Sequence, residues 1–216
     1  MKNLEIISLD SGPNPQGLVI WLHGLGADGH DFEPIVPLLE LNQPLRFQFP
    51  NAPVRPVTIN GGMEMRSWYD IDANLGSSVA DIEHSSAALN QLIDQAKTDG
   101  FTDKQIVLAG FSQGGVIAMH SGLRHGNQLA GIMALSTYLN DPDTVQAELS
   151  FESVDTPVFM AHGQADAMIP LARGVTSRDS LLALNYSVEW HDYPMGHEVC
   201  HQEIQDIATW LNRVFA

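Results

Sequence analysis

Short apolar runs return at intervals along this chain, and their spacing constrains the fold more than any other feature of the sequence. Bounded by turn-forming residues, these runs predict strands at 4–9, 18–22, 45–49, 106–109, 131–135, 158–161 and 187–190. Between some of them, apolar residues recur at helical spacing, over 79–96 and again over 204–215. Strands that alternate with helices predict an α/β fold, a mostly parallel sheet with helices on both faces. Ligands of such sheets bind beyond the carboxyl ends of the strands, so we expect functional residues in the loops that follow strands.

The length and composition of the chain predict one domain. Its 216 residues, 44% hydrophobic and 17% charged, are enough to bury one sizeable core. We therefore expect a single domain over residues 1–216. Two connections, 50–77 and 136–156, are too long to be simple turns, and loops of this length are usually functional.

The charge of the chain restricts its partners. Ten basic residues against 26 acidic ones give a net charge of −16, which repels nucleic acid phosphates and anionic lipid headgroups. We expect no nucleic acid partner and no stable membrane association. Coenzyme A thioesters are disfavoured for the same reason, because their phosphates usually bind a cluster of basic residues. An uncharged small molecule is the substrate that this charge favours.

The cysteine content and the termini predict a cytoplasmic protein. Cys200 is the only cysteine, which excludes an intramolecular disulfide and a zinc site built on several thiolates. No apolar run reaches the roughly 18 residues of a membrane helix, and residues 1–10 contain acids where a signal peptide would be apolar.

The segment 106–119 combines an apolar strand, the pattern Gly110-Phe-Ser112-Gln-Gly114 and an apolar helix. This order is typical of a nucleophile elbow, in which a serine hydroxyl stands on a tight turn at the start of a helix. Glycine is expected at positions 110 and 114 because a side chain at either place would collide with the neighbouring strand or helix. Ser112 is therefore the candidate nucleophile.

A nucleophilic serine needs a base to take its proton and an acid to orient that base, here in the chain order serine, acid, histidine. Asp166 follows the 158–161 strand and is the candidate acid, with Asp192 as the alternative. Among the histidines downstream, His197 is the candidate base because it alone lies in a loop, whereas His191 falls in a strand and His201 in the last helix. Gly196 is expected to let the imidazole approach the serine.

Acyl transfer also needs N–H donors for the oxyanion of the tetrahedral intermediate. The backbone N–H of Gln113, directly after the nucleophile, is one candidate. The second is the N–H of Leu25 in the glycine loop His23-Gly24-Leu25-Gly26. His23 begins this loop, and we expect it to make structural hydrogen bonds rather than to take part in catalysis.

With these residues placed, the sequence resembles the carboxylesterase and acyl-protein thioesterase family, a compact branch of the α/β-hydrolases without a large lid. The resemblance covers nearly the whole chain and rests on residues 21–28, 50–53, 57–62, 67–70, 109–115, 162–166 and 193–199. It implies a triad of Ser112, Asp166 and His197, oxyanion donors at Leu25 and Gln113, and no cofactor. It also implies an apolar acyl groove, here lined by Leu25, Ile71, Leu75, Tyr138 and Met168.

We expect this groove to accept short to medium acyl chains of neutral esters. Asp72 and Asn74 would lose water beneath a long chain, at a cost of about 1 to 3 kcal/mol for each unpaired polar group. The alternative within the family is an acyl-protein thioesterase or lysophospholipase that removes long chains. For the oligomeric state, we expect either a monomer or a homodimer.

Two remote alternatives remain. His197-Glu198-Val-Cys200-His201 matches the zinc pattern H-E-x-x-H, but Gly196 suggests that His197 precedes the helix on which both histidines would have to lie. The second alternative is a binding protein that has the hydrolase fold but no catalytic activity, although no member of the triad is missing. Cys200 is either a small buried residue or a redox-sensitive thiol.

Overall fold

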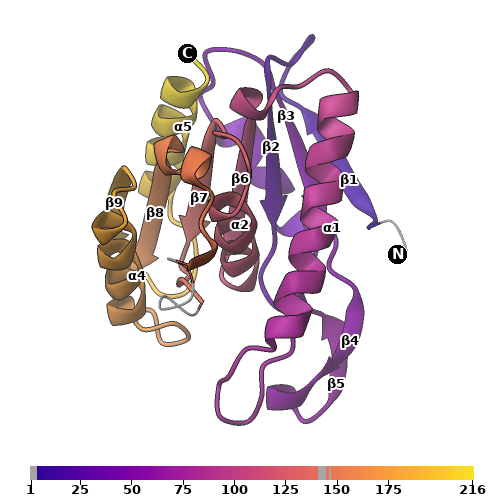
Figure 1. Cartoon of the computed structure of the whole chain (residues 1–216), viewed down its shortest axis with the longest axis vertical. Helices are drawn as coiled ribbons and strands as arrows, with labels where there is room; N and C mark the ends of the chain where they lie inside the picture. Colours follow the sequence, from indigo (N-terminus) through magenta and orange to yellow (C-terminus); the bar gives the residue numbers. More distant parts are fainter. Residues whose placement is uncertain (1–3, 141–144, 146) are drawn as a thin grey trace.

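The computed structural model describes residues 4–140, 145 and 147–216. Residues 141–144 and 146, which belong to the long connection expected over 136–156, therefore lie outside the described residues. In the described part, strands and helices alternate along much of the chain, as expected (Figure 1).

One seven-stranded sheet forms the centre of the molecule, in the order β1-β3-β2-β6-β7-β8-β9. Only β1 is antiparallel to its neighbour, β3, and the other neighbouring pairs are parallel. The strands are β1 (Ile6–Asp10), β2 (Gly17–Leu22), β3 (Leu45–Pro50), β6 (Ile106–Phe111), β7 (Gly131–Leu135), β8 (Val158–Gly163) and β9 (Val188–Tyr193). Each overlaps a predicted strand, so the mostly parallel sheet is confirmed.

Helices cover both faces of this sheet, as predicted. One face carries α1 (Val79–Thr98), α2 (Gln113–Leu123) and α4 (Leu171–Ala183). The opposite face carries α5 (His201–Val214) with the short 3-10 turns η1 (Gly29–Asp31) and η2 (Glu33–Leu38). Figure 1 shows the first three helices in front of the sheet and α5 behind it. Further 3-10 turns are η3 (Thr58–Asn60), η4 (Asp103–Gln105) and η5 (Phe151–Asp155).

Two features of the fold were not predicted from the sequence. The connection 50–77 contains a two-stranded hairpin, β4 (Val54–Val57) and β5 (Met63–Arg66). The hairpin is largely exposed and therefore lacks the apolar run by which a buried strand is recognised. Helix α4 was missed for a similar reason, because it buries only Gly174, Ser177 and Leu181.

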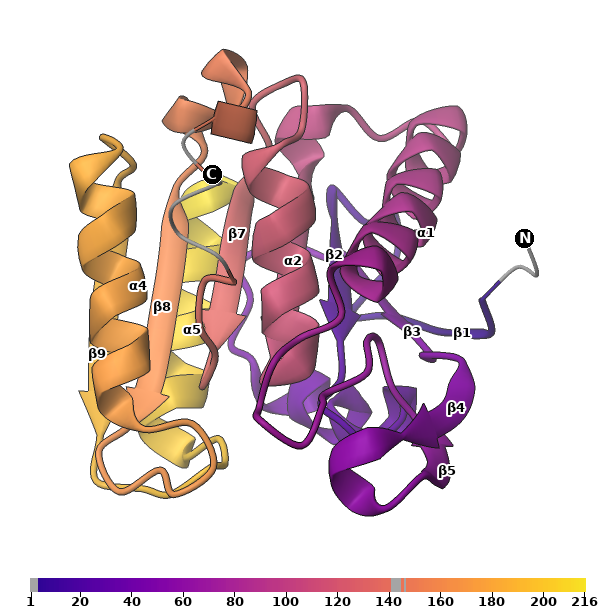
Figure 2. The ribbon, with the colours of Figure 1, turned by 60° about the horizontal axis from the view of Figure 1, so that its bottom comes forward.

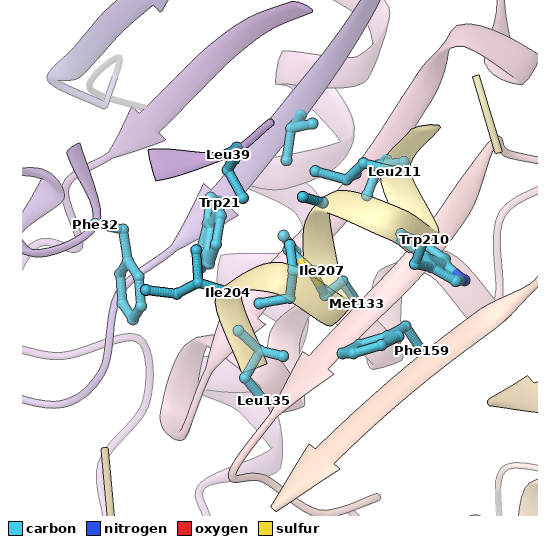
Figure 3. Packing of buried hydrophobic residues seen from close by; sticks show 14 of the residues in the cluster. Trp21, Phe32, Leu39, Met133, Leu135, Phe159, Ile204, Ile207, Trp210 and Leu211 are labelled. Atoms are coloured by element: carbon cyan, nitrogen blue, oxygen red, sulfur yellow. The ribbon is translucent and has the colours of Figure 1, made fainter. Parts of the chain in front are cut away.

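The core consists of two layers of side chains, one on each face of the sheet. Alternate residues of β2 point to opposite faces, so that Leu18, Ile20 and Leu22 pack beneath α1 and α2 while Val19 and Trp21 pack beneath α5. Figure 3 shows the α5 layer, in which side chains of the helix contact those of β2, β7 and β8. Full burial of an aliphatic side chain stabilises a fold by about 1.5 to 3 kcal/mol, so these two layers stabilise the sheet.

This packing fixes the carboxyl ends of the parallel strands at one end of the molecule. In Figure 2, the arrowheads of β7 and β8 and the β4–β5 hairpin all lie at that end. The loops in which the sequence analysis places the functional residues therefore share one edge. In the described part of the chain, no helix combines the length and the apolar character needed to cross a bilayer.

Candidate active site

Ser112 stands at the turn between β6 and α2, in a backbone conformation that residues other than glycine rarely adopt. Its φ is 53° and its ψ is −119°, and its N–H donates to the Leu135 carbonyl at 2.9 Å. Such a conformation costs on the order of 1 to 3 kcal/mol and persists only where the surroundings enforce it. The sharp turn expected from the sequence is therefore present.

The glycines on either side of Ser112 make this turn possible. A Cβ on Gly110 would lie 2.3 Å from the backbone of Gly114, and a Cβ on Gly114 would lie 2.5 Å from the Leu22 carbonyl oxygen. Both clashes involve backbone atoms, which cannot move aside as the end of a flexible side chain can. Strand β2, strand β6 and helix α2 are thus in close contact at the serine, as predicted.

A hydrogen-bonded series connects the three residues that the sequence analysis singled out. His197 Nε2 lies 2.9 Å from Ser112 Oγ, and His197 Nδ1 lies 2.7 Å from Asp166 Oδ2. These residues come from the ends of β6, β8 and β9, which are far apart in the sequence and meet at the carboxyl edge of the sheet. A hydroxyl, an imidazole and a carboxylate in this order can pass a proton from the hydroxyl to the imidazole while the carboxylate holds the ring.

The Asp166 carboxylate is fully buried and well satisfied. Its Oδ1 accepts hydrogen bonds from the backbone N–H groups of Met168 and Ile169, at 2.9 and 2.8 Å. Its Oδ2 faces His197 and also lies 3.5 Å from His162 Nε2. The alternative acid, Asp192, instead accepts from Gln164 and Trp190 on the exposed surface. Of these two acids, Asp166 is thus the one beside the imidazole.

The loop that carries His197 is positioned by close backbone contact. A Cβ on Gly163 would lie 2.1 Å from the Gly196 carbonyl oxygen and 2.6 Å from that of Met195, so glycine is required at the end of β8. A Cβ on Gly196 would meet nothing within 4 Å, so the expectation that Gly196 allows the close approach is wrong. The imidazole also packs on Phe111, with ring centroids 4.7 Å apart.

The glycine loop after β2 lies beside the serine. A Cβ built on Gly24 would be 3.5 Å from Ser112 Cβ, which places the next residue, Leu25, at the edge of the elbow. In the part of the chain that the structure describes, the N–H groups of Leu25 and Gln113 donate to no other group. Both N–H groups therefore remain candidates for the oxyanion donors.

His23 is fully buried beneath this loop, and among the described residues its side chain hydrogen-bonds only to backbone groups. Its Nε2 accepts from the Ala52 N–H at 3.0 Å, which leaves the proton on Nδ1 to be donated to the Gly24 carbonyl at 2.7 Å. Burial lowers the pKa of His23, which favours this neutral form. The structural role expected for this histidine is thus observed.

The side chains of Gln113 and Thr137 hold the elbow, which was not predicted from the sequence. The amide of Gln113 accepts from the Trp68 N–H at 2.8 Å and donates to the Tyr69 carbonyl at 2.7 Å, which ties α2 to the loop before α1. Thr137 Oγ1 donates to the Ser112 carbonyl at 2.7 Å. A buried polar side chain directly after the serine was the one signal that could have indicated the first of these contacts.

The residues expected to line an acyl groove differ in their surroundings. Tyr138 is buried and Ile71 is half-buried within one apolar cluster, and Leu25 is half-buried beside the serine. Leu75 and Met168 expose 63% and 74% of their surface and belong to no buried cluster in the described part. Near Leu75, Asp72 accepts from the backbone N–H groups of Asn74 and Gly76 and stays at the surface.

The zinc pattern at 197–201 does not lie on one helical face. Helix α5 begins at His201, whereas His197 precedes it in a loop and directs both ring nitrogens to Asp166 and Ser112. The described residues contain no group of three or more potential metal ligands. Cys200 is half-buried at the start of α5.

Known proteins resemble this chain along most of its length. A family model described as Phospholipase/Carboxylesterase matches residues 2–215. Acyl-protein thioesterase 1 of Neurospora crassa is 38% identical over 213 residues, covering 89% of this chain and 84% of that protein. Carboxylesterase SOBER1 of Arabidopsis thaliana is 30% identical over 203 residues, covering 90% of this chain and 89% of that protein. The crystal structure of Zea mays acyl-protein thioesterase 2 matches with a TM-score of 0.85 and 25% identity, over 98% of this chain and 99% of that one.

Proposed function

The chain belongs to the phospholipase/carboxylesterase family of α/β-hydrolases, and from this premise we propose that it is a serine carboxylesterase whose nucleophile is Ser112. Hydrolysis of carboxylic esters or thioesters is the activity that this membership assigns to it. The single observation that carries the proposed mechanism is the series Ser112 Oγ, His197, Asp166, with separations of 2.9 and 2.7 Å.

In the first half of the proposed reaction, His197 Nε2 takes the proton of Ser112 while Oγ attacks the acyl carbon. The N–H groups of Leu25 and Gln113 stabilise the resulting oxyanion, and each such donor contributes about 3 kcal/mol to the transition state. His197 then returns the proton to the leaving alcohol or thiol, and an acyl-serine remains. Asp166 keeps the proton of the imidazole on Nδ1, so that Nε2 is free to act as the base.

In the second half, His197 Nε2 takes a proton from water, which attacks the acyl-serine. The same two N–H groups stabilise the second oxyanion. Collapse of this intermediate releases the carboxylic acid, and the proton returns to Ser112 Oγ. No cofactor or metal takes part in the proposed cycle.

We propose neutral esters with short to medium acyl chains as the preferred substrates. The charge of −16 supports this choice because it opposes anionic membranes and the phosphates of coenzyme A. The apolar surface offered by Leu25, Ile71, Tyr138, Leu75 and Met168 is interrupted by the exposed turn at Asp72. Removal of long acyl chains, as the names of the thioesterase relatives suggest, is the alternative.

We extend this proposal to the whole chain: residues 1–216 form one hydrolase domain, which acts in the cytoplasm as a monomer or a homodimer. A single sheet that reaches from β1 to β9 supports it. Light scattering measures the mass in solution, and limited proteolysis that released a stable fragment would contradict the single domain.

Substitution of the nucleophile tests the mechanism. We expect Ser112→Ala to abolish ester turnover and labelling by a fluorophosphonate probe, with an unchanged melting temperature, because the change removes one oxygen and creates no core cavity. Ser136→Ala is the matched control, since Ser136 follows the neighbouring strand β7 with a φ of 44° but is fully buried. Labelling or native turnover that survives in Ser112→Ala would refute the assignment, and the control should keep both.

A chain-length series tests the substrate. Each methylene buried in an apolar groove contributes about 0.8 kcal/mol, so kcat/KM for nitrophenyl esters should increase with acyl length until the groove is full. We expect the optimum at short to medium chains. The series is compared with palmitoyl coenzyme A and with an S-palmitoylated peptide. A clear preference for the palmitoylated peptide would favour protein deacylation instead.

A further inference from the structure

A guanidinium group is held against a buried tyrosine close to the candidate active site. The Cζ atom of Arg173, in the first turn of α4, lies 3.5 Å from the centroid of the Tyr138 ring. Both residues line a hollow of about 330 Å³, together with Asn140 and Thr176. Tyr138 is buried whereas Arg173 is exposed, so the ring fixes one face of the guanidinium and its N–H donors stay accessible.

The charge of Arg173 is not neutralised by the described part of the protein. The other arginines that the structure describes each form an ion pair with a carboxylate: Arg46, Arg55, Arg66, Arg124, Arg178 and Arg213. Among the described residues, Arg173 has no carboxylate within 4 Å, although the chain has 26 acidic residues. No described carboxylate therefore competes with an anionic ligand for this guanidinium.

The hollow adjoins the candidate active site through two segments. Thr137, which donates to the Ser112 carbonyl, directly precedes Tyr138. On the other side, Ile169 donates its N–H to Asp166, and the Arg173 N–H donates to the carbonyl of the next residue, Pro170. The two segments that carry Tyr138 and Arg173 are thus continuous with residues that hydrogen-bond to Ser112 and Asp166.

The position of the imidazole indicates which part of a substrate would reach this hollow. His197 packs on Phe111, which belongs to the core layer under α5. Tyr138 and Ile169 belong to the opposite layer, with α1 and α2. The leaving alcohol must lie beside the imidazole that protonates it. The acyl part is therefore the part that extends toward Tyr138 and Arg173.

We propose that Arg173 binds a carboxylate at the far end of the acyl chain, so that half-esters of dicarboxylic acids are substrates besides neutral esters. This inference rests on the proposed esterase function and defines a substrate class for it. The Tyr138 hydroxyl lies 3.2 Å from the Tyr69 hydroxyl and 3.2 Å from the Ser77 hydroxyl, and these groups add polar character near the guanidinium. A single carboxylate matches this one cation, whereas the several phosphates of coenzyme A do not.

A matched substrate pair measures the contribution of Arg173. We compare kcat/KM for nitrophenyl hydrogen adipate and nitrophenyl hexanoate, which have the same acyl length and differ in the terminal carboxylate, after subtraction of the rate without enzyme. In Arg173→Gln, kcat/KM for the adipate should fall about fivefold to tenfold, as for the loss of a solvent-screened charged hydrogen bond. The value for the hexanoate should change less than about twofold, since no charge is involved.

Arg178→Gln is the control on the same helix, because Arg178 is paired with Asp179. Arg178→Gln should leave the ratio of kcat/KM for the adipate to kcat/KM for the hexanoate unchanged. If Arg173→Gln leaves the ratio of kcat/KM for the two substrates unchanged, the proposal is overturned. Ser112-dependent hydrolysis of the hexanoate would still support the esterase function in that case. If neither ester is hydrolysed through Ser112, the proposed function fails, and the role of Arg173 fails with it.

Discussion

Glu203 is a buried carboxyl group whose protonation state links the stability of the protein to pH. It lies in the first turn of α5 with no exposed surface, and burial raises its pKa to about 8; the Cys200 N–H opposes this rise and the charge of Asp206 adds to it. The folded protein therefore keeps a proton that the unfolded chain releases near its ordinary pKa of 4.5. The free energy of unfolding should fall as the pH rises through this interval.

We expect Glu203→Gln to remove this pH dependence. The variant should be more stable than the parent by a few kcal/mol above pH 8, and the difference should shrink toward pH 4.5, because one pKa unit corresponds to about 1.4 kcal/mol. Urea unfolding at a series of pH values measures the difference. Glu198→Gln, at an exposed position in the preceding loop, is the control. Parallel curves for the parent and Glu203→Gln would show that Glu203 does not titrate in this way.

At the scale of elements, the end of β8 determines where the loop after β9 can lie. A Cβ on Gly163 would overlap the carbonyl oxygens of Gly196 and Met195, so Gly163→Ala must displace the loop that carries His197. A displacement of about 1 Å at a catalytic group can cost on the order of 100-fold in rate. We expect a loss of kcat of that order, measured with a nitrophenyl ester alongside the melting temperature.

Gly196→Ala provides the comparison for this substitution. A methyl group there meets open space, so the variant should keep kcat within about twofold of the parent, because open space requires no rearrangement. If both alanine variants lost activity equally, the close contact at Gly163 would not be what positions the imidazole.

At the scale of the whole molecule, the charge of −16 should act on anionic substrates over a distance. The screening length is about 8 Å at physiological ionic strength and about 30 Å at 0.01 M, so repulsion is strongest in dilute buffer. We expect kcat/KM for butyryl coenzyme A to rise as sodium chloride is added, while that for nitrophenyl butyrate stays constant. A value for the thioester that fell with added salt would instead indicate an attractive cluster of basic residues.

The sequence by itself determined the sheet and the elbow, because both depend on neighbouring residues. An apolar run of a few residues flanked by turn residues is sufficient to indicate a buried strand, and all seven were found in this way. The turn at Ser112 likewise requires Gly110 and Gly114 next to it, and the sequence shows them directly. The hairpin at 54–66 and helix α4 were missed because they are mostly exposed and leave no apolar pattern.

Only the tertiary structure decided which distant groups meet. His197 lies 31 residues from Asp166 and 85 from Ser112 in the sequence. Local sequence patterns could therefore rank candidate residues, but they could not show that these side chains are in contact. In the structure, Asp166 contacts His197 whereas Asp192 lies on the exposed surface. Glycine is required sterically at position 163 and not at 196, and the Arg173 guanidinium packs on the Tyr138 ring. Each of these facts depends on how parallel strands align their carboxyl ends, since that alignment brings together loops that no short stretch of sequence contains.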